Sequence, residues 1–262
     1  MISVIDFKNS KKSGTPISIV TCYDYWSAKI INETGIDAVL VGDSAAMVMH
    51  GYKTTINATI EMMIYHVSAV KKGLTDKFLI ADLPFLTHKK GNKFLMNSVD
   101  VLMKAGAHSV KIEGAGGNLK AIKSVVESGI PVMGHIGLTP QSFNQFGGYR
   151  VQGKDDKTAE LLIEDAKLLE EAGCYSIVLE LIPSALAKTI TESISVPTIG
   201  IGAGQYTSGQ VLVLQDLLGL NKDFKPKFLK FFMDGFNQIK TALDQYDHEV
   251  KQNVFPSDKE SF

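Results

Sequence analysis

Short apolar runs alternate with amphipathic stretches along most of the chain. The apolar runs predict eight strands, at Ile17–Thr21, Ala38–Val41, Phe78–Ala81, Ser109–Glu113, Pro131–Gly134, Ser176–Leu179, Pro197–Ile199 and Val211–Leu214. The amphipathic stretches predict helices at Ser27–Glu33, Thr59–Gly73, Asn97–Ala105, Leu119–Ser128, Thr158–Ala172, Ala185–Ile194 and Phe228–Leu243. Buried strands that alternate with helices are typical of a parallel sheet, and eight such units close into a barrel. We therefore expect an α/β fold with a single (β/α)8 TIM barrel.

The two ends of the chain fall outside this repeat. A short N-terminal helical segment is expected around Ser3–Ser10, and the tail from His248 to Phe262 is polar with isolated apolar residues. Such a tail either frays or docks on a neighbouring subunit. No interior linker rich in Pro and Ser interrupts the pattern, so we expect residues 1–262 to form one barrel domain.

An acidic residue stands at the end of three successive apolar runs. Asp43, Asp82 and Glu113 each lie where a buried strand would reach its C-terminal end. In a barrel these ends converge on one mouth, where the carboxylates would repel each other without a positive partner. A hard divalent cation with oxygen ligands is the simplest partner. The alternative is that each acid caps the next helix, which suits one Asp better than three strand ends.

Other polar residues occupy the same predicted strand ends. Lys111 alternates with apolar neighbours, so it would face the barrel interior and need an anionic ligand or one of the acids. The alternative is a side chain that reaches solvent. His135 ends the fifth strand, Glu180 closes the sixth, and Ser44 follows Asp43. Acids with a Lys and a His at a barrel mouth predict metal-assisted proton abstraction next to a carbonyl.

Two glycine-rich loops follow predicted strands. The loop from His135 to about Lys157 is long for a compact domain, and we expect it to act as a lid. The loop Gly200–Gly204 follows the seventh strand without dinucleotide-binding spacing. It would either bind phosphate, as late loops of barrels do, or let the backbone approach the site.

The cysteines and most histidines are expected to have packing or surface roles. Cys22 and Cys174 adjoin apolar runs and lack metal-ligand spacing. The histidines other than His135 lie in expected loops or helices, at His50, His66, His88, His108 and His248. Only His135 is a candidate for the site.

The composition narrows the possible functions. Apolar residues make up 45% of the chain and charged residues 21%, as in ordinary globular proteins, and the net charge is -1. A chain without a basic excess is not expected to bind nucleic acid. No apolar stretch reaches the length of a membrane span, which is about 18 residues. The N-terminus carries no secretory signal pattern, so we expect a cytoplasmic protein that does not contact membranes.

Seven motifs, in matching order, resemble one known family. They are Val41-Gly-Asp-Ser44, Met62-Met-Ile-Tyr-His66, Asp82-Leu-Pro-Phe85, Val110-Lys-Ile-Glu-Gly114, Gly134-His-Ile-Gly-Leu-Thr-Pro-Gln-Ser142, Phe146-Gly-Gly-Tyr149 and Ile199-Gly-Ile-Gly-Ala-Gly204. From Thr21 through Lys227 the chain resembles the ketopantoate hydroxymethyltransferase (3-methyl-2-oxobutanoate hydroxymethyltransferase) family.

The resemblance implies a reaction and a site. The reaction transfers a hydroxymethyl group from the cosubstrate 5,10-methylenetetrahydrofolate to 3-methyl-2-oxobutanoate, giving 2-dehydropantoate on the route to pantothenate. The implied ligands of Mg2+ are Asp43, Asp82 and Glu113, and the implied catalytic base is Glu180. The implied substrate-binding positions are Asp43, Ser44, Asp82, Lys111 and His135. A homo-oligomer, a decamer of two pentameric rings, is implied as well.

Five residues, at three places in the chain, depart from the common pattern of the family. Ala45-Ala46 replaces Leu-Gly, Thr207-Ser208 replaces Cys-Asp, and Gln215 replaces His. None of them is a proposed ligand or base, so we expect effects on pocket shape and loops rather than loss of activity.

Two alternatives stay open at this point. The first is another Mg2+-dependent barrel lyase acting on a 2-oxo acid, which would need a catalytic Cys in a KKCGH-like loop that this sequence lacks. The second is an inactive barrel kept as a binding or assembly subunit, which would have lost at least one of its four acids. All four are present, at Asp43, Asp82, Glu113 and Glu180.

Overall fold

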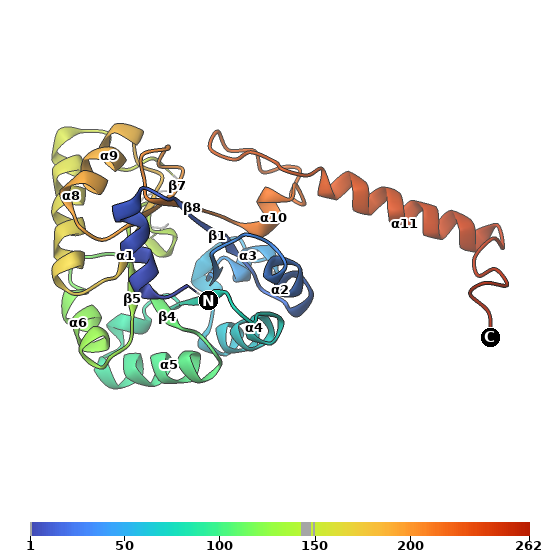
Figure 1. Cartoon of the computed structure of the whole chain (residues 1–262), viewed down its shortest axis with the longest axis horizontal. Coiled ribbons are helices and arrows are strands. Elements are labelled where there is room, and N and C mark those ends of the chain that lie inside the picture. Colours follow the sequence, from blue (N-terminus) through green and yellow to red (C-terminus); the bar gives the residue numbers. More distant parts are fainter. Residues whose placement is uncertain (1, 143–147, 149) are drawn as a thin grey trace. The chain divides into compact units, whose positions relative to one another are not determined.

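Eight parallel strands close into a barrel in the computed structural model, which describes residues 2–142, 148 and 150–262 (Figure 1). The strands follow each other around the barrel in chain order. Their bounds are β1 Ile17–Thr21, β2 Ala38–Val41, β3 Phe78–Asp82, β4 Ser109–Glu113, β5 Val132–Gly137, β6 Ser176–Glu180, β7 Thr198–Ile201 and β8 Gly209–Leu212. The predicted (β/α)8 barrel is confirmed.

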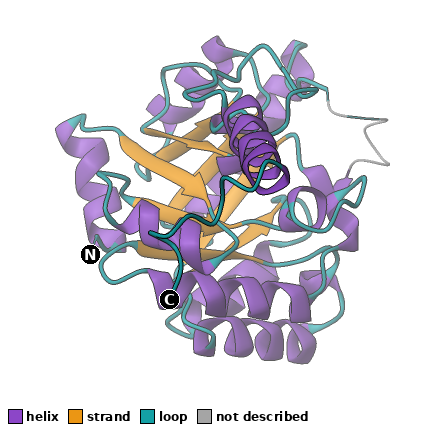
Figure 2. Ribbon diagram, turned by 90° about the vertical axis from the view of Figure 1, so that its right-hand side faces the viewer, coloured by secondary structure: helices purple, strands orange, loops and turns teal. Residues whose placement is uncertain are grey.

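Helices surround the strands, as Figure 2 shows. The longer ones are α2 Tyr25–Asn32, α4 Ile60–Gly73, α5 Asn92–Lys104, α6 Leu119–Glu127, α8 Asp156–Glu171 and α9 Ser184–Ser193. Short turns of helix lie at α3 Ala45–Val48, η1 Thr55–Asn57, η2 Thr87–Lys89 and η3 Pro140–Ser142. Side chains cap several helices, because the first amides of a helix lack intrahelical partners. Asp24 accepts from the Ser27 amide, Thr59 from Met62 and Asp155 from Thr158.

The N-terminal helix α1, Val4–Ser13, closes the N-terminal end of the barrel. Its Phe7 is fully buried, with ring centroids 5.6 Å from Phe78 and 5.2 Å from Tyr175. Lys11 of the same helix donates from Nζ to three backbone carbonyl oxygens, of Thr191, Ile194 and Val196, at 2.6, 2.6 and 3.0 Å. Apolar contacts and charge-assisted hydrogen bonds thus fix α1 to this end.

Alternation along the strands separates an apolar interior from a polar mouth. The interior cluster contains every second residue of several strands, such as Ile17 and Ile19 or Phe78 and Ile80. Two residues beyond Ile80 the same alternation reaches Asp82. The interior-facing set therefore changes from apolar to charged toward the C-terminal ends of the strands.

Residues 213–262 form a second compact unit, separate from the unit of residues 1–212. It contains α10 Leu214–Leu217 and α11 Gly235–Lys251. Within it, the amides of Gly235 and Phe236 donate to the carbonyls of Leu218 and Gly219. That the chain forms one domain stays a prediction.

Several predicted boundaries were wrong, including the end of strand β5, which runs to Gly137 rather than Gly134. Helix α5 begins at Asn92 rather than Asn97, directly after Gly91. Strand β8 begins at Gly209 and ends at Leu212, because parallel pairing with β1 fixes its register and a Cβ at Gly209 would collide with the Ile17 carbonyl. Helix α11 begins at Gly235 and runs to Lys251, so the expected polar tail starts inside it. None of the described helices is long and apolar enough to cross a membrane.

Candidate active site

Strand register brings the predicted residues together. Asp82 pairs with Lys111 between β3 and β4, and Glu113 pairs with His135 between β4 and β5. Glu180 ends β6 opposite Gly137. Side chains from four strands therefore meet at one mouth of the barrel, as expected from the sequence.

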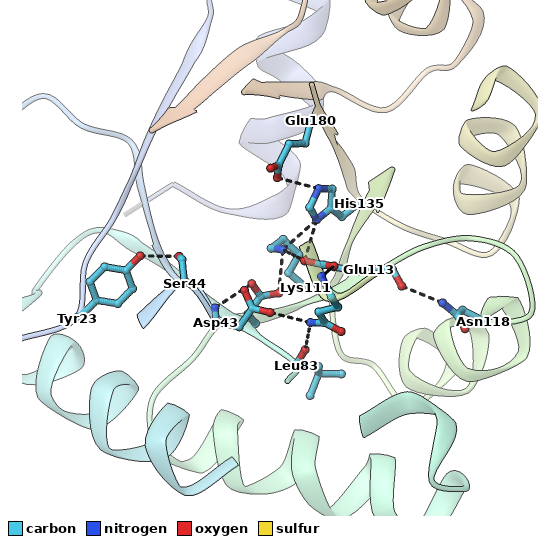
Figure 3. Close-up of polar contacts among 11 residues, drawn as sticks. Tyr23, Asp43, Ser44, Leu83, Lys111, Glu113, Asn118, His135 and Glu180 are labelled. Atoms are coloured by element: carbon cyan, nitrogen blue, oxygen red, sulfur yellow. Dashed lines mark hydrogen bonds and ion pairs between the residues drawn. The ribbon is translucent and has the colours of Figure 1, made fainter. Parts of the chain in front are cut away.

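Three buried carboxylates form the centre of the site (Figure 3). One oxygen from each of Asp43, Asp82 and Glu113 lies within 4.8 Å of the other two. Lys111 Nζ lies 2.9 Å from Asp82 Oδ1 and 3.7 Å from Glu113 Oε1. The predicted contact of Lys111 with neighbouring acids is confirmed, and its solvent-facing alternative was wrong.

His135 connects this centre to Glu180. Its Nδ1 lies 3.4 Å from Glu113 Oε1 and 3.2 Å from Lys111 Nζ, and its Nε2 lies 3.2 Å from Glu180 Oε2. The Glu180 side chain is 17% exposed, whereas that of Glu113 is 3% exposed. Glu180 is thus the acid of the site most accessible to an incoming molecule.

Burial and neighbouring charges shift the pKa values of these groups. Burial, Asp82 and Glu113 raise the pKa of the Asp43 carboxyl well above its usual range. Burial raises the pKa of Asp82 as well, although Lys111 opposes this. Burial opposes the ionisation of Glu113, but His135 and Lys111 outweigh burial and lower its pKa. Burial and mutual repulsion therefore oppose the simultaneous ionisation of all three acids.

Neighbouring carboxylates favour the charged forms of the two cations of the site. Burial opposes the charge of Lys111, but Asp82 and Glu113 raise its pKa above the ordinary value. Burial and Lys111 both lower the pKa of His135, yet Glu113 and Glu180 raise it to about 9. Both cations lie close to Glu113, and Lys111 also lies close to Asp82. Of the three acids, Asp43 therefore has the strongest tendency to bind a proton.

The donor set fits a hard divalent cation. All three carboxylates offer oxygen, the ligand that Mg2+ prefers. Asp82 Oδ1 and Glu113 Oε1 accept no well-aligned hydrogen bond among the described residues, although Lys111 Nζ lies 2.9 Å from the former. An added positive charge would also favour the ionised form of Asp43, which its neighbours oppose.

Ser44 faces a different partner from the acids. Its hydroxyl lies 2.7 Å from the Tyr23 hydroxyl, and Tyr23 is buried after β1. Asp43 and Asp82 are joined at the same turn, because the Asp43 amide donates to Asp82 Oδ2 at 3.2 Å. Sequence reasoning missed Tyr23, whose only local signal is its position after a strand.

Gln141 is the second residue that sequence reasoning missed. Its Nε2 donates to Asp43 Oδ2 and to the Leu83 carbonyl, both at 2.9 Å, and its backbone amide donates to Glu113 Oε2 at 3.1 Å. The side chain is buried at 6% exposure. One neutral residue thus contacts two of the three acids. Its signal was membership of the motif that begins at Gly134.

The predicted loops are described in part. Residues 143–147 and 149 of the expected lid lie outside the described residues, so the lid stays a prediction. In the later glycine loop, Gln210 Nε2 donates to the Gly204 carbonyl at 2.9 Å. Ala45 and Ala46, which depart from the family pattern, are buried in α3 directly after Ser44. They leave the three acids intact.

Fold and site together define a class of protein: a (β/α)8-barrel enzyme with a buried acidic site, suited to a divalent cation, at the C-terminal ends of its strands. Within that class, the chain belongs to the ketopantoate hydroxymethyltransferase family, whose family model matches residues 1–258. The family expected from the sequence motifs is confirmed.

Full-length relatives agree with this assignment. The 3-methyl-2-oxobutanoate hydroxymethyltransferase of Bdellovibrio bacteriovorus is 54% identical over 262 residues, which is 100% of both chains. That of Coxiella burnetii (strain Dugway 5J108-111) is 57% identical over 252 residues, covering 96% of this chain and 95% of the relative.

Solved structures share the fold at much lower identity. One is 2,3-dimethylmalate lyase, a member of the PEP mutase/isocitrate lyase superfamily, with a TM-score of 0.61 and 14% identity over 100% of this chain and 93% of that chain. Another is phosphoenolpyruvate phosphomutase from Streptomyces platensis subsp. rosaceus, with a TM-score of 0.64 and 10% identity over 96% and 88%. These likenesses establish the fold alone.

Proposed function

We infer that the chain is a 3-methyl-2-oxobutanoate hydroxymethyltransferase. It transfers a one-carbon unit from 5,10-methylenetetrahydrofolate to 3-methyl-2-oxobutanoate and yields 2-dehydropantoate for pantothenate and coenzyme A biosynthesis. The observation that carries this inference is the meeting of three buried carboxylates and Lys111 at the barrel mouth. The chain that holds them is 54% identical, over its whole length, to an enzyme of that name.

The acidic centre is proposed to hold Mg2+ through Asp43, Asp82 and Glu113. When bound, the ion supplies Lewis-acid polarisation of the keto group of the substrate. Lys111 offsets the negative charge of the substrate carboxylate, because its ammonium is buried among the acids and stays protonated. Asp43, Ser44, Asp82, Lys111 and His135 are the proposed substrate contacts.

Glu180 is the proposed base that removes the C3 proton of the keto acid. It is the most exposed acid of the site, and the His135 imidazole, 3.2 Å away, orients its carboxylate. The proton from C3 moves to Glu180, and the electron pair left on C3 forms the new bond to the one-carbon unit. The bonds from that carbon to the folate nitrogens break, water supplies the hydroxyl oxygen, and tetrahydrofolate leaves. A base positioned in this way contributes about 10²–10⁴-fold to the rate.

The cysteines argue against the alternative of a lyase with a cysteine in its site. Cys174 is buried immediately before β6, at the barrel end opposite the acids. Cys22 is also buried, and burial raises the pKa of both thiols. Burial therefore disfavours the reactive thiolate form of both cysteines. The inactive-barrel alternative is disfavoured because all four acids meet at the mouth.

The test is an assay of 2-dehydropantoate formation from 3-methyl-2-oxobutanoate and 5,10-methylenetetrahydrofolate, with and without Mg2+. We expect turnover that depends on the metal. Absence of turnover under both conditions would overturn the proposed function.

Glu180→Gln separates the base from the rest of the site. We expect deuterium exchange at C3 of the keto acid to fall about 10²–10⁴-fold, with Mg2+ binding retained. Exchange is followed by NMR without folate, so it reports proton removal alone. Glu171→Gln, an exposed residue at the end of α8, is the matched control. Unchanged exchange in Glu180→Gln would remove Glu180 as the base.

We also propose that the chain is cytoplasmic and forms a homo-oligomer, a decamer. The support for association is the row of exposed apolar side chains on α11, which includes Ile239 at 48% and Leu243 at 63% exposure. Its small-molecule partners are the 2-oxo acid and the folate, with no nucleic acid or membrane partner.

A further inference from the structure

His50 and His66 bring two imidazole rings together outside the acidic centre. His50 follows α3 and His66 lies inside α4, and their Nε2 atoms are 2.9 Å apart. The ring centroids are 5.1 Å apart, with an interplanar angle of 72°. The sequence predicts only packing or surface roles for both, because they are 16 residues apart in separate elements. Their meeting is a property of the fold.

A backbone contact fixes the orientation and tautomer of His66. Its Nδ1 lies 2.6 Å from the Tyr23 carbonyl oxygen, which can only accept, so Nδ1 carries the ring proton. In the neutral ring this leaves the Nε2 lone pair directed toward His50. A histidine that binds a metal through one nitrogen usually donates from the other to a carbonyl or carboxylate. His66 already makes that second contact through the buried Tyr23.

His50 stands on a turn whose backbone is held in place. The amides of Gly51 and Tyr52 donate to the carbonyls of Met47 and Ala46, at 3.1 and 3.0 Å. The side chain itself is exposed, so the ring is free to adjust. A tetrahedral ion bonded to two imidazoles at about 2.0–2.1 Å separates their nitrogens by roughly 3.3 Å. The observed separation of 2.9 Å therefore requires only a small outward movement of His50.

We propose that His50 and His66 form a second metal site, for a borderline divalent ion such as Ni2+ or Zn2+. Imidazole nitrogens suit these ions, whereas Mg2+ prefers the carboxylate oxygens of the acidic centre. On binding, the His50 proton lies on Nδ1, so that both Nε2 lone pairs face the ion. Water fills the remaining positions. Metal binding by His50 and His66 is independent of the proposed reaction.

Calorimetric titration with NiCl2 tests the second site. The full chain, without a histidine tag, is kept in excess Mg2+ so that the acidic centre is occupied. We expect a Ni2+ binding event in the wild type that His50→Ala weakens about tenfold or more, as loss of a metal contact does. His50→Gln should weaken it similarly, because a Gln preserves hydrogen bonding but is a poor ligand for these ions.

His248→Ala is the matched control, since it removes another exposed histidine. It should keep the Ni2+ affinity of the wild type. Melting temperatures without added metal establish that each variant is folded before titration. Equal Ni2+ affinity and stoichiometry in the wild type and in folded His50→Ala would overturn the proposal, as would absence of Ni2+ binding by the wild type. Because the readout is binding, failure of the proposed reaction would leave this result unaffected.

Discussion

Gln141 carries no charge, yet it determines how two of the acids are held. Its amide donates to Asp43 Oδ2 and its backbone to Glu113 Oε2, so the other oxygen of each carboxylate stays available. In Gln141→Ala, Asp43 Oδ2 and the Leu83 carbonyl lose a buried donor. We expect Mn2+, used as a probe for Mg2+, to bind about 10–100-fold more weakly. Electron paramagnetic resonance of free Mn2+ measures this binding without turnover.

Gln152→Ala is the matched control for this substitution. Gln152 lies in the same connection to α8, but its Nε2 donates to the Arg150 carbonyl rather than to an acid. It should bind Mn2+ as the wild type does. Wild-type affinity in Gln141→Ala would show that the acids hold their positions without the amide.

His108 makes the stability of the barrel depend on pH, and it does so independently of the active site. Its Nδ1 accepts a hydrogen bond from the Leu79 amide at 2.9 Å, which requires an unprotonated nitrogen. Burial, together with Lys71, lowers the pKa of His108 below 6.5. Because folding lowers the pKa of His108, this residue contributes its full stability above pH 6.5. The contribution is lost as the pH falls through the pKa of His108 in the folded protein.

The corresponding experiment compares melting temperatures of the wild type and His108→Gln between pH 7.5 and pH 5. Gln can accept from the same amide but does not titrate. We expect the variant to lose less stability on acidification than the wild type. Parallel curves for the two proteins would contradict this account of His108.

Sequence pattern placed charged residues of the site but not their neutral partners. Asp82, Lys111 and Glu113 could be predicted because strand alternation and strand ends are local properties. Gln141 and Tyr23 could not, since an amide in a loop and a tyrosine after a strand acquire their roles from contacts distant in sequence. The contact between His50 and His66 could not be predicted for the same reason, because it joins residues of separate elements.

At the scale of elements, one charged side chain adds to the apolar contacts of Phe7 that hold α1 to the barrel. Lys11 donates to carbonyls at the end of α9, where a helix leaves its last carbonyls without intrahelical partners. Lys11→Met keeps most of the aliphatic chain and removes the donors. We expect the free energy of unfolding to fall by about 2 kcal/mol, measured by urea denaturation. Lys12→Met, at an exposed neighbouring position, should change it far less.

Element boundaries were predicted where they follow burial. β1, β2 and β4 have the expected bounds; β2 and β4 are buried throughout, and β1 at all but one position. α11 does not, since the spacing of Phe228 and Phe232 is helical although the helix begins only at Gly235. There the Phe232 amide donates to the Leu217 carbonyl instead. Apolar periodicity without a cap signal was insufficient evidence for a helix start.

At the scale of the molecule, α11 presents an apolar seam with coiled-coil spacing. The seam consists of exposed residues that alternate three and four positions apart, Phe236, Ile239, Leu243, Tyr246 and Val250. Such a seam is stable in water when another helix covers it. We expect the double variant Ile239→Lys, Leu243→Lys to shift the chain to a smaller assembly, measured by light scattering.

Thr241→Lys is the control, because residue 241 lies opposite the seam and adds the same kind of charge. It should retain the mass of the wild type. An unchanged mass in the double variant would show that the seam is not where copies of this chain associate.

The closed N-terminal end of the barrel also restricts the order in which the substrates bind. With Phe7 buried between Phe78 and Tyr175, nothing passes through the barrel axis, and both substrates must use the mouth that contains the acids. If the keto acid binds against Lys111 as proposed, it lies deepest, and the larger folate would block its path. We therefore expect ordered binding, in which the keto acid enters first and its hydroxymethylated product leaves last.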